Sequence, residues 1–266
     1  MVVSVSTDLR PESAAEANIV VPVTARGMSA AEVVEILLTG EMAEVHGLMP
    51  WSSNYTFLVT VAHNDIRLLA VYKPARGERP LWDFPHGTLA MREVAAYLVS
   101  EALGWNLIPP TVLRDGEYGP GAVQLFIEAD FEQHYFTLRE EPAAVFAYVA
   151  AFDVITNNAD RKAGHFLKAT DGHIWVVDHG LTFHAEPKLR TVVWEFAGQP
   201  LPEAIQVDLR RLQATLRDPE SPLLSQLQRL IAPAEIKAFR QRLSQLLRAG
   251  HFPLPGPARC VPFPPV

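Results

Sequence analysis

The chain has 266 residues, of which 48% are hydrophobic and 20% are charged. This supply of apolar side chains is sufficient for a substantial core and excludes a chain that is disordered as a whole. There are 23 Lys and Arg against 30 Asp and Glu, giving a net charge of −7. This balance argues against a dedicated nucleic-acid scaffold or an electrostatic lipid anchor, although it allows a local basic groove. The single cysteine, Cys260, excludes disulfide frameworks and cysteine-rich zinc sites.

The cellular location is predicted from two absences in the sequence. The first ten residues lack the basic start and the apolar segment of a signal peptide. The longest apolar run, residues 143–152, is half as long as the ~20 residues that a membrane-spanning helix needs. We therefore expect a cytoplasmic protein with no stable membrane insertion and no nucleic-acid partner.

The first half of the chain is predicted to be rich in strands. Residues 1–28 have no sustained periodicity and are expected to form a loose arm. A serine before helix formers, apolar residues at helical spacing and a closing glycine predict a capped amphipathic helix at 29–40. β-Branched and aromatic segments separated by polar turns predict an antiparallel meander. The predicted strands lie at 44–49, 55–61, 67–72, 111–112 and 122–127, with a helix at 91–103.

The second half is predicted to be mainly helical. The expected helices lie at 142–155, 203–216, 222–231 and 233–247, with short strands at 166–168 and 174–177. Strands with helices following them predict an α+β fold in two lobes. We assign a strand-rich N-lobe to 29–126, a helical C-lobe to 127–248 and a proline-rich tail to 249–266.

Two aspartates are the first candidates for chemistry. Asp160 follows a helix predicted to be buried, and Asp178 follows an apolar strand and precedes Gly180. Two carboxylates on converging loops suit metal-assisted phosphoryl transfer, in which one orients or deprotonates a hydroxyl group and the other holds a divalent ion. Each aspartate alone is typical of an ordinary turn. The pair together favours a site.

Lys73 and Glu93 are the next candidates. Lys73 ends a predicted strand, and Pro74 restricts its backbone to extended geometry, from which its ammonium group can reach phosphates. Glu93 lies near the start of the following helix, where the helix dipole favours an acidic group, and can pair with Lys73. Taken singly, each is more typical of a solvated surface charge.

The order of these elements and residues resembles the phosphatidylinositol 3-/4-kinase-like superfamily. The resemblance is to an actinobacterial subgroup akin to type II phosphatidylinositol 4-kinases and HipA-type kinases, and it spans residues 35–200. It is carried by the segments 71–74, 92–97, 158–161 and 177–180, with 76–85 and 193–198 for the subgroup. It implies a two-lobed protein-kinase-like fold with ATP bound between the lobes.

The resemblance also implies roles for single residues. Lys73 would contact the α- and β-phosphates, with Glu93 holding it in place. Asp160 would be the catalytic base, and Asp178 would bind the metal. The remaining contacts to ATP would come from a phosphate-covering turn and from a hinge segment. The turn residues are Ser52, Ser53 and Asn54, and the hinge residues are Gln124, Phe126 and Ile127.

His165 departs from the pattern of the superfamily. The pattern usually has an asparagine as the second metal ligand five residues after the catalytic aspartate, and this chain has His165 there. An imidazole is a softer ligand than an amide oxygen, so the site would prefer Mn²⁺ to Mg²⁺ or hold one ion instead of two. Alternatively, His165 braces Asp178 by a hydrogen bond.

The predicted activity is that of a kinase that uses ATP with Mg²⁺ or Mn²⁺. The acceptor would be a hydroxyl group of a protein Ser or Thr, a small molecule or a lipid headgroup. Because of His165 and a phosphate-covering turn without glycine, a nucleotide-binding scaffold without activity is an alternative. Transfer of AMP on the same fold is another. A metallohydrolase built from the histidines of residues 134–184 is disfavoured, because their spacing contains no recognisable ligand pair.

Overall fold

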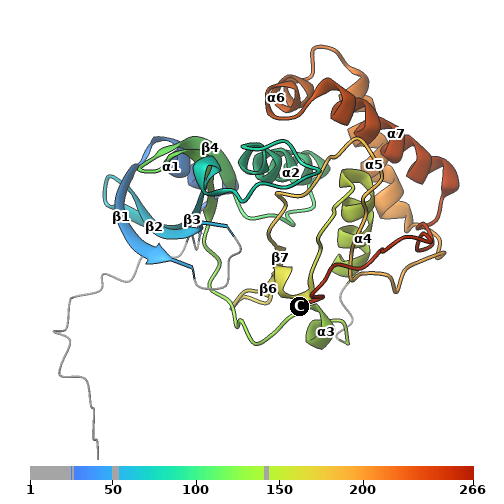
Figure 1. Ribbon diagram of the computed structural model, residues 1–266, viewed down its shortest axis with the longest axis horizontal. Coiled ribbons are helices and arrows are strands. Elements are labelled where there is room, and N and C mark those ends of the chain that lie inside the picture. The colour runs from blue at the N-terminus through green and yellow to red at the C-terminus, as the bar shows by residue number, and fades with distance from the viewer. Residues whose placement is uncertain (1–24, 26, 50–53, 141–143) are drawn as a thin grey trace, which may run out of the picture.

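The computed structural model describes residues 25, 27–49, 54–140 and 144–266, which form two lobes (Figure 1). The N-lobe contains a five-stranded antiparallel sheet in the order β1-β2-β3-β5-β4. Its strands are β1 (Glu41–Leu48), β2 (Phe57–His63), β3 (Ile66–Pro74), β4 (Thr111–Gly116) and β5 (Gly119–Leu125). The predicted meander therefore corresponds to β1, β2 and β3.

One face of the sheet is covered by α1 (Ala30–Thr39). Ser29 and Glu32 form a reciprocal capping box, which satisfies backbone donors at the start of this helix. Alternate residues of β3, such as Ala70 and Tyr72, are buried in the same apolar cluster as Ile36 of α1. Since neighbouring residues of a strand point to opposite faces, Lys73 lies on the other face.

That other face is occupied by α2 (Leu89–Leu103), which connects the lobes. This helix packs against β4 and β5 on one side and against two helices of the C-lobe on the other (Figure 1). Arg92 of α2 is buried and donates hydrogen bonds to the carboxylate of Glu235 (2.7 Å) and to the backbone oxygen of Thr182 (2.7 Å). The position of α2 relative to the C-lobe is thus fixed by a buried ion pair as well as by apolar contacts.

The C-lobe is built from helices around a second apolar core. Its helices are α3 (Tyr135–Leu138), α4 (Val145–Thr156), α5 (Glu203–Arg217), α6 (Pro222–Leu230) and α7 (Pro233–Ala249). A two-stranded sheet of β6 (Phe166–Lys168) and β7 (Ile174–Val176) completes it, with a short 3-10 turn at Ala163–His165. A second 3-10 turn, Ala75–Gly77, follows β3 in the N-lobe. The α+β fold predicted in two lobes is confirmed.

Differences from the predicted elements lie mostly at their ends. β1 starts three residues earlier than expected, directly after α1, and β4 continues to Gly116 because it pairs with β5 along its length. Helix α3 was not predicted, because its single turn is too short to show a helical period. In the described part of the chain, no helix combines the length and hydropathy needed to cross a membrane.

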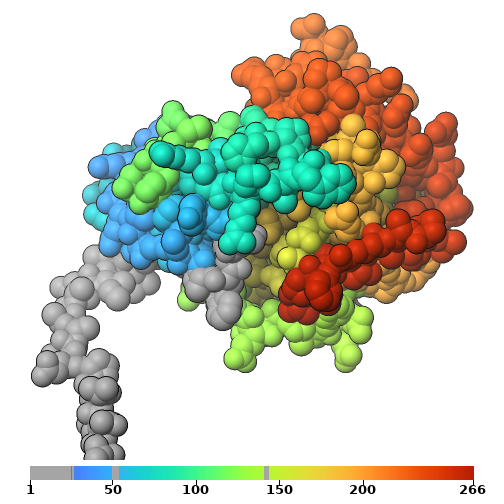
Figure 2. Space-filling model, in the orientation of Figure 1, coloured from blue at the N-terminus to red at the C-terminus, as the bar shows by residue number. Residues whose placement is uncertain are grey.

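The proline-rich tail lies extended along the C-lobe (Figure 2). The backbone oxygen of Cys260 accepts hydrogen bonds from the backbone of Thr191 (3.0 Å) and from the indole of Trp194 (3.1 Å). Close to the C-terminus, the oxygen of Pro265 accepts a hydrogen bond from the N–H of Ala163 (2.8 Å). The tail is therefore attached to the loop that carries Asp160 and His165.

Candidate functional site

Lys73 lies between two carboxylates that come from different elements. Its Nζ atom donates a hydrogen bond to Oε1 of Glu93 on α2 and lies 3.7 Å from Oδ1 of Asp178. Burial alone would lower the pKa of Lys73, but the negative charges of both carboxylates outweigh it and raise this pKa above its ordinary value. The lysine is therefore a fixed positive charge at neutral pH, held at the inner face of the sheet.

Glu93 joins the lysine to the segment after β7. Its side chain is almost completely buried, and its second oxygen accepts a hydrogen bond from the backbone N–H of His179 at 2.8 Å. Because α2 begins at Leu89, Glu93 lies in the second turn and not in the first turn that the sequence predicted. Its position is therefore fixed by its two hydrogen-bond donors, and the helix dipole contributes little.

The start of α2 is held by another glutamate, Glu78. Its Oε1 atom accepts hydrogen bonds from the N–H groups of Leu89 (3.0 Å) and Ala90 (3.1 Å), which have no partner within the helix. Burial raises the pKa of Glu78, although these hydrogen bonds and others from nearby backbone act in the opposite direction. The segment after β3 thus positions the helix that carries Glu93.

Asp178 follows β7 and has a left-handed backbone conformation, with φ at 61°. Aspartate tolerates this conformation better than most residues with a side chain. Its carboxylate is 55% exposed and points one oxygen toward Lys73 and the other toward His165. Burial opposes ionisation, but the neighbouring positive charge of Lys73 holds the pKa of Asp178 below its ordinary value. The carboxylate of Asp178 is therefore ionised and accessible.

His165 lies with its Nε2 atom 3.4 Å from Oδ2 of Asp178. Burial lowers its pKa to about 3, so the ring is neutral at physiological pH. Its Nδ1 atom accepts a hydrogen bond from the N–H of Lys162 at 3.3 Å, which assigns the ring proton to Nε2. A protonated Nε2 faces the carboxylate, an arrangement that favours the bracing role over the metal-binding role.

Asp160 lies in the loop after α4 and is half-buried. Its backbone N–H donates to Oδ1 of Asn158 at 3.0 Å, and its Oδ2 atom lies 3.3 Å from Nζ of Lys162. Burial raises the pKa of Asp160, the negative charge of Asp178 raises it further, and Lys162 partly offsets both effects. Asp178 is therefore close enough to influence the ionisation of Asp160.

A buried carboxylate that the sequence analysis overlooked supports this loop. Asp153 of α4 has no exposed surface and accepts hydrogen bonds from Asn158 (2.9 Å), Thr191 (3.0 Å) and the guanidinium group of Arg161 (3.1 Å). A single acid within the apolar run of α4 was the available signal, because buried acids are rare unless they are paired. Asp153 orders the backbone on either side of Asp160.

The side chain of Arg161 is bound within the fold by several hydrogen bonds. Besides Asp153, its guanidinium group bonds the backbone oxygen of Val177 (2.9 Å) and Nε2 of His179 (2.6 Å). Arg161 is completely buried and its guanidinium group is bonded within the fold, so it is not available to contact a phosphate. Since arginine only donates, Nε2 of His179 is the acceptor. The guanidinium group therefore connects the loop of Asp160 to the segment that contains Asp178.

The predicted nucleotide contacts are only partly described. Ser52 and Ser53 lie outside the described residues. Asn54 lies between β1 and β2, and its side chain accepts a hydrogen bond from the N–H of Arg79 at 2.9 Å. This contact ties the loop to the segment after β3. A role of this loop in covering phosphates stays a prediction.

The predicted hinge lies at the end of β5, where the chain leaves the sheet. The side chain of Gln124 is buried and donates a hydrogen bond to Thr111 at 2.8 Å, so it joins β5 to β4 within the sheet. The N–H of Phe126 donates to the oxygen of Leu69 at 3.0 Å and is therefore not available to adenine. Ile127 is buried immediately after it. A contact between this segment and adenine stays a prediction.

The carboxylate of Asp178 near Lys73 suits a metal ion that is already bound to phosphate oxygens and water. Among the described residues, no group of three or more His, Cys, Asp or Glu side chains is arranged to hold a metal ion. Mg²⁺ is usually bound by one or two carboxylates together with phosphate oxygens and water. Asp178 alone is sufficient for this requirement.

Comparison with known proteins gives a family and one short local similarity. No protein-family profile matches the chain. Protein Rv2133c of Mycobacterium tuberculosis is 40% identical over 264 residues, which cover 86% of this chain and 94% of that protein. The chain belongs to the family of Rv2133c. That name states no activity, so membership alone identifies no reaction.

Two further similarities concern kinases. Phosphatidylinositol 4-kinase gamma 4 of Oryza sativa subsp. japonica is 31% identical over 113 residues, which cover 35% of this chain and 20% of that protein. The crystal structure of the Helicobacter pylori proinflammatory kinase CtkA aligns with a TM-score of 0.49 and 11% identity, over 81% of this chain and 94% of that chain. The rice kinase matches only part of the Rv2133c-family chain.

Proposed function

We propose that this protein is an ATP-dependent phosphotransferase, which moves the γ-phosphate of ATP to a hydroxyl group. The observation that carries the proposal is the meeting of Lys73, Glu93 and Asp178 from three separate elements. Phosphoryl transfer depends on positioning and on charge neutralisation, for which a fixed cation and an accessible carboxylate are the main requirements. The local similarity to a rice phosphatidylinositol 4-kinase supports the same class of reaction.

Lys73, held by Glu93, would bind the phosphates of ATP. The ammonium group of Lys73 would donate hydrogen bonds to phosphate oxygens as a point charge. Glu93 would hold this group at the inner face of the sheet, and the N–H of His179 would in turn hold Glu93. The lysine therefore would not have to give up side-chain freedom when ATP binds.

Asp178 would hold Mg²⁺ or Mn²⁺ together with phosphate oxygens. When bound, the ion supplies neutralisation of the charge on the β- and γ-phosphates. His165 would keep one oxygen of Asp178 in a defined direction through its Nε2–H group. This role differs from the direct ligation that the sequence suggested for His165.

Asp160 would accept the proton of the acceptor. The hydroxyl oxygen attacks the γ-phosphorus, the bond to the β,γ-bridging oxygen breaks, and ADP leaves with the electrons of that bond. The hydroxyl proton passes to a carboxylate oxygen of Asp160. A raised pKa suits this step, because a carboxylate that is harder to ionise is a stronger base. The acceptor would be a protein Ser or Thr, a small alcohol or a lipid headgroup.

One observation favours a second candidate, a nucleotide-binding protein that transfers nothing. His165 occupies the position at which the superfamily that this chain resembles has a second metal ligand. Its Nε2 atom carries a proton and faces Asp178. A site with a single ion would bind ATP and stabilise the fold without completing the transfer. Nucleotide binding and turnover therefore have to be measured separately.

The test incubates the full chain with ATP and either Mg²⁺ or Mn²⁺ and measures ADP release together with the intact mass of the protein. We expect ADP release that falls roughly 10² to 10⁴-fold in Asp160→Ala. Asp171→Asn, which changes an exposed carboxylate in the same lobe, should keep full turnover. Thermal stabilisation by ATP without turnover would favour the second candidate, and an added AMP mass would identify adenylyl transfer instead.

A further inference from the structure

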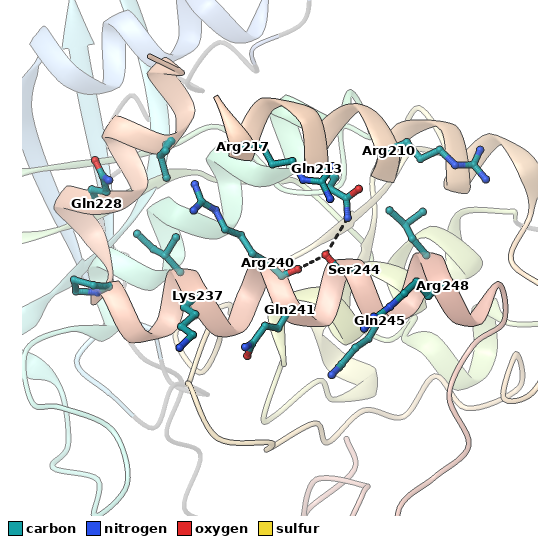
Figure 3. A pocket seen from close by; sticks show the side chains of 14 residues that line it. Arg210, Gln213, Arg217, Gln228, Lys237, Arg240, Gln241, Ser244, Gln245 and Arg248 are labelled. Carbon is teal, nitrogen blue, oxygen red and sulfur yellow. Dashed lines mark hydrogen bonds between the residues drawn. The ribbon is translucent and has the colours of Figure 1, made fainter. Parts of the chain in front are cut away.

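A long groove on the C-lobe is separate from the residues around Lys73. It lies between α5 and α7, with α6 at one end, and has a volume of about 1220 Å³ (Figure 3). None of Lys73, Glu93, Asp160 and Asp178 lines it. The groove therefore needs an explanation of its own.

The groove carries only positive charge. Five of its 14 lining residues are cationic and none is acidic, in a chain whose net charge is −7. The cationic residues are Arg210, Arg217, Lys237, Arg240 and Arg248. Such a concentration of one sign raises the local concentration of anions and attracts an anionic partner.

The cations form two rows that face each other. Arg210 and Arg217 lie two turns apart on α5, and Lys237, Arg240 and Arg248 follow one face of α7. The helices run in opposite directions, so Arg210 lies near Arg248 and Arg217 near Arg240 (Figure 3). The row from Lys237 to Arg248 spans about 16 Å, the length of about five residues of an extended chain.

Most of these cations are not used by the fold. Arg240 is an exception, because it donates to the backbone oxygen of Leu216 and so ties α7 to α5. Arg217, Lys237 and Arg248 are exposed, and among the residues that the structure describes they form no ion pair and no hydrogen bond. Three positively charged side chains thus line the groove without stabilising the described part of the fold by a hydrogen bond or an ion pair.

The other polar groups of the groove discriminate between anions. Four glutamines line it, and a carboxamide presents both a donor and an acceptor, as a peptide group does. A phosphate chain offers acceptors only. Guanidinium groups match carboxylates in a bidentate arrangement. Arginines with carboxamides therefore suit an acidic peptide, whose side chains and backbone can both be bound.

Other polyanions fit the groove less well. Proteins that bind single-stranded nucleic acid stack bases on aromatic side chains, and no aromatic residue lines this groove. Helices that lie on membranes present exposed apolar residues on a convex face. Here the surface is concave, and of its four apolar lining residues Leu224 and Ile236 are buried, Leu247 is half-buried and Pro233 is exposed. We infer that this groove binds an extended acidic segment of a protein partner.

The inference goes beyond the proposed function, because the groove would bind this segment even if the site around Lys73 transferred nothing. A direct test measures the fluorescence anisotropy of a labelled octaglutamate peptide with the full chain at low salt. We expect saturable binding that weakens as salt is added, and none for octaglutamine. Absence of octaglutamate binding at low salt would overturn the inference.

Charge reversal locates the binding. Arg217→Glu, Lys237→Glu and Arg248→Glu should each weaken octaglutamate binding at least fivefold. Arg229→Glu is the matched control, since Arg229 is an exposed arginine of α6 that does not line the groove, and it should change binding less than twofold. Equal effects of all four variants would overturn the inference. Thermal melting verifies that each variant is folded. If a charge-reversal variant does not fold, the milder Arg217→Gln is measured in its place.

Three competitors decide the class of ligand. We expect octaglutamate to be displaced weakly by tripolyphosphate, by a single-stranded oligonucleotide and by vesicles that contain an anionic phospholipid. Gln241→Leu should weaken octaglutamate binding more than tripolyphosphate binding, because a peptide backbone can use both the donor and the acceptor of the carboxamide, whereas a phosphate can use only the donor. Tighter binding of the oligonucleotide or the vesicles, lost in Lys237→Glu, would overturn the assignment to a peptide.

Discussion

The carboxylate of Glu93 accepts a hydrogen bond from the backbone N–H of His179 at 2.8 Å, although 86 residues separate the two positions. Its other oxygen accepts from Lys73. One buried side chain therefore connects β3, α2 and the segment after β7. The lysine and the carboxylate of Asp178 owe their proximity to this connection.

Replacing Glu93 by glutamine should break the connection. A carboxamide has one acceptor oxygen, so it can serve Lys73 or His179 but not both, and its NH₂ group would face the other donor. We expect a loss of roughly 1 to 3 kcal/mol in the free energy of unfolding, measured by urea denaturation. Glu101→Gln on the exposed side of the same helix is the control and should cost less than about 0.5 kcal/mol. Equal stability of the two variants would contradict this role of Glu93.

Replacing Asp153 by asparagine should destabilise the loop that carries Asp160. The change leaves the guanidinium group of Arg161 buried without its counter-charge. Removing one partner of a buried ion pair typically costs about 3 to 5 kcal/mol. Urea denaturation should show a loss of this size, and Asp171→Asn should leave the midpoint almost unchanged. A loss below about 1 kcal/mol in Asp153→Asn would show that the ion pair is not structural.

Glu78 should give a pH-dependent contribution to stability. Burial raises its pKa in the folded protein, so the folded state binds more protons than the unfolded state in the window just above the ordinary pKa of 4.5. The contribution is therefore present at lower pH and is lost as the pH rises through the folded-state pKa. Glu78→Gln has no such term, and its stability relative to the native protein should increase from pH 4 to pH 7.

Two measurements distinguish this charge effect from simple loss of a cap. Glutamine keeps an acceptor for the N–H groups of Leu89 and Ala90, whereas alanine removes it, so Glu78→Ala should be about 1 kcal/mol less stable than Glu78→Gln at both pH values. Urea denaturation of all three proteins at pH 4 and pH 7 gives the comparison. A relative stability of Glu78→Gln that falls with rising pH would have the wrong sign.

Lys162 should set the acid limb of the pH–rate profile if Asp160 is the base. Its ammonium group lies 3.3 Å from Oδ2 of Asp160 and lowers the pKa of this aspartate. Lys162→Met removes the positive charge, so the pKa of Asp160 should rise and the acid limb of kcat/KM should move to higher pH. Lys237→Met, far from the site, is the control for the position of the limb. Movement to lower pH would exclude Asp160 as the titrating base.

The fold could be predicted to a large extent because its signals are local. The capping box of Ser29 and Glu32 and the polar turns between strands identify elements directly. The order of the strands in the sheet could not be predicted from local signals. β5 pairs with β3 and leaves β4 at the edge, and such pairing depends on contacts between segments distant in the sequence. For the same reason, the predicted ends of strands differ from the observed ends by several residues.

The site could be predicted only in part. Lys73 and Glu93 were recognised as a pair from their places on a strand and a helix, and the resemblance supplied the roles expected of them toward ATP. The burial of Arg161 could not be predicted, since its partner Asp153 lies on another element and only the folded chain brings them together. The basic groove was likewise allowed by the composition, but its two rows face each other only because α5 and α7 pack antiparallel.

The most direct test of the account is calorimetric titration of ATP with Mg²⁺ into the native protein and into Asp178→Asn, with Asp171→Asn as the control. Lys73 and Asp178 are proposed to bind one metal–nucleotide complex, so the native protein and the control should bind ATP with the same affinity. Binding by Asp178→Asn should be at least tenfold weaker, about 1.4 kcal/mol or more. Equal affinity for ATP in all three proteins, or no binding to the native protein, would contradict the account.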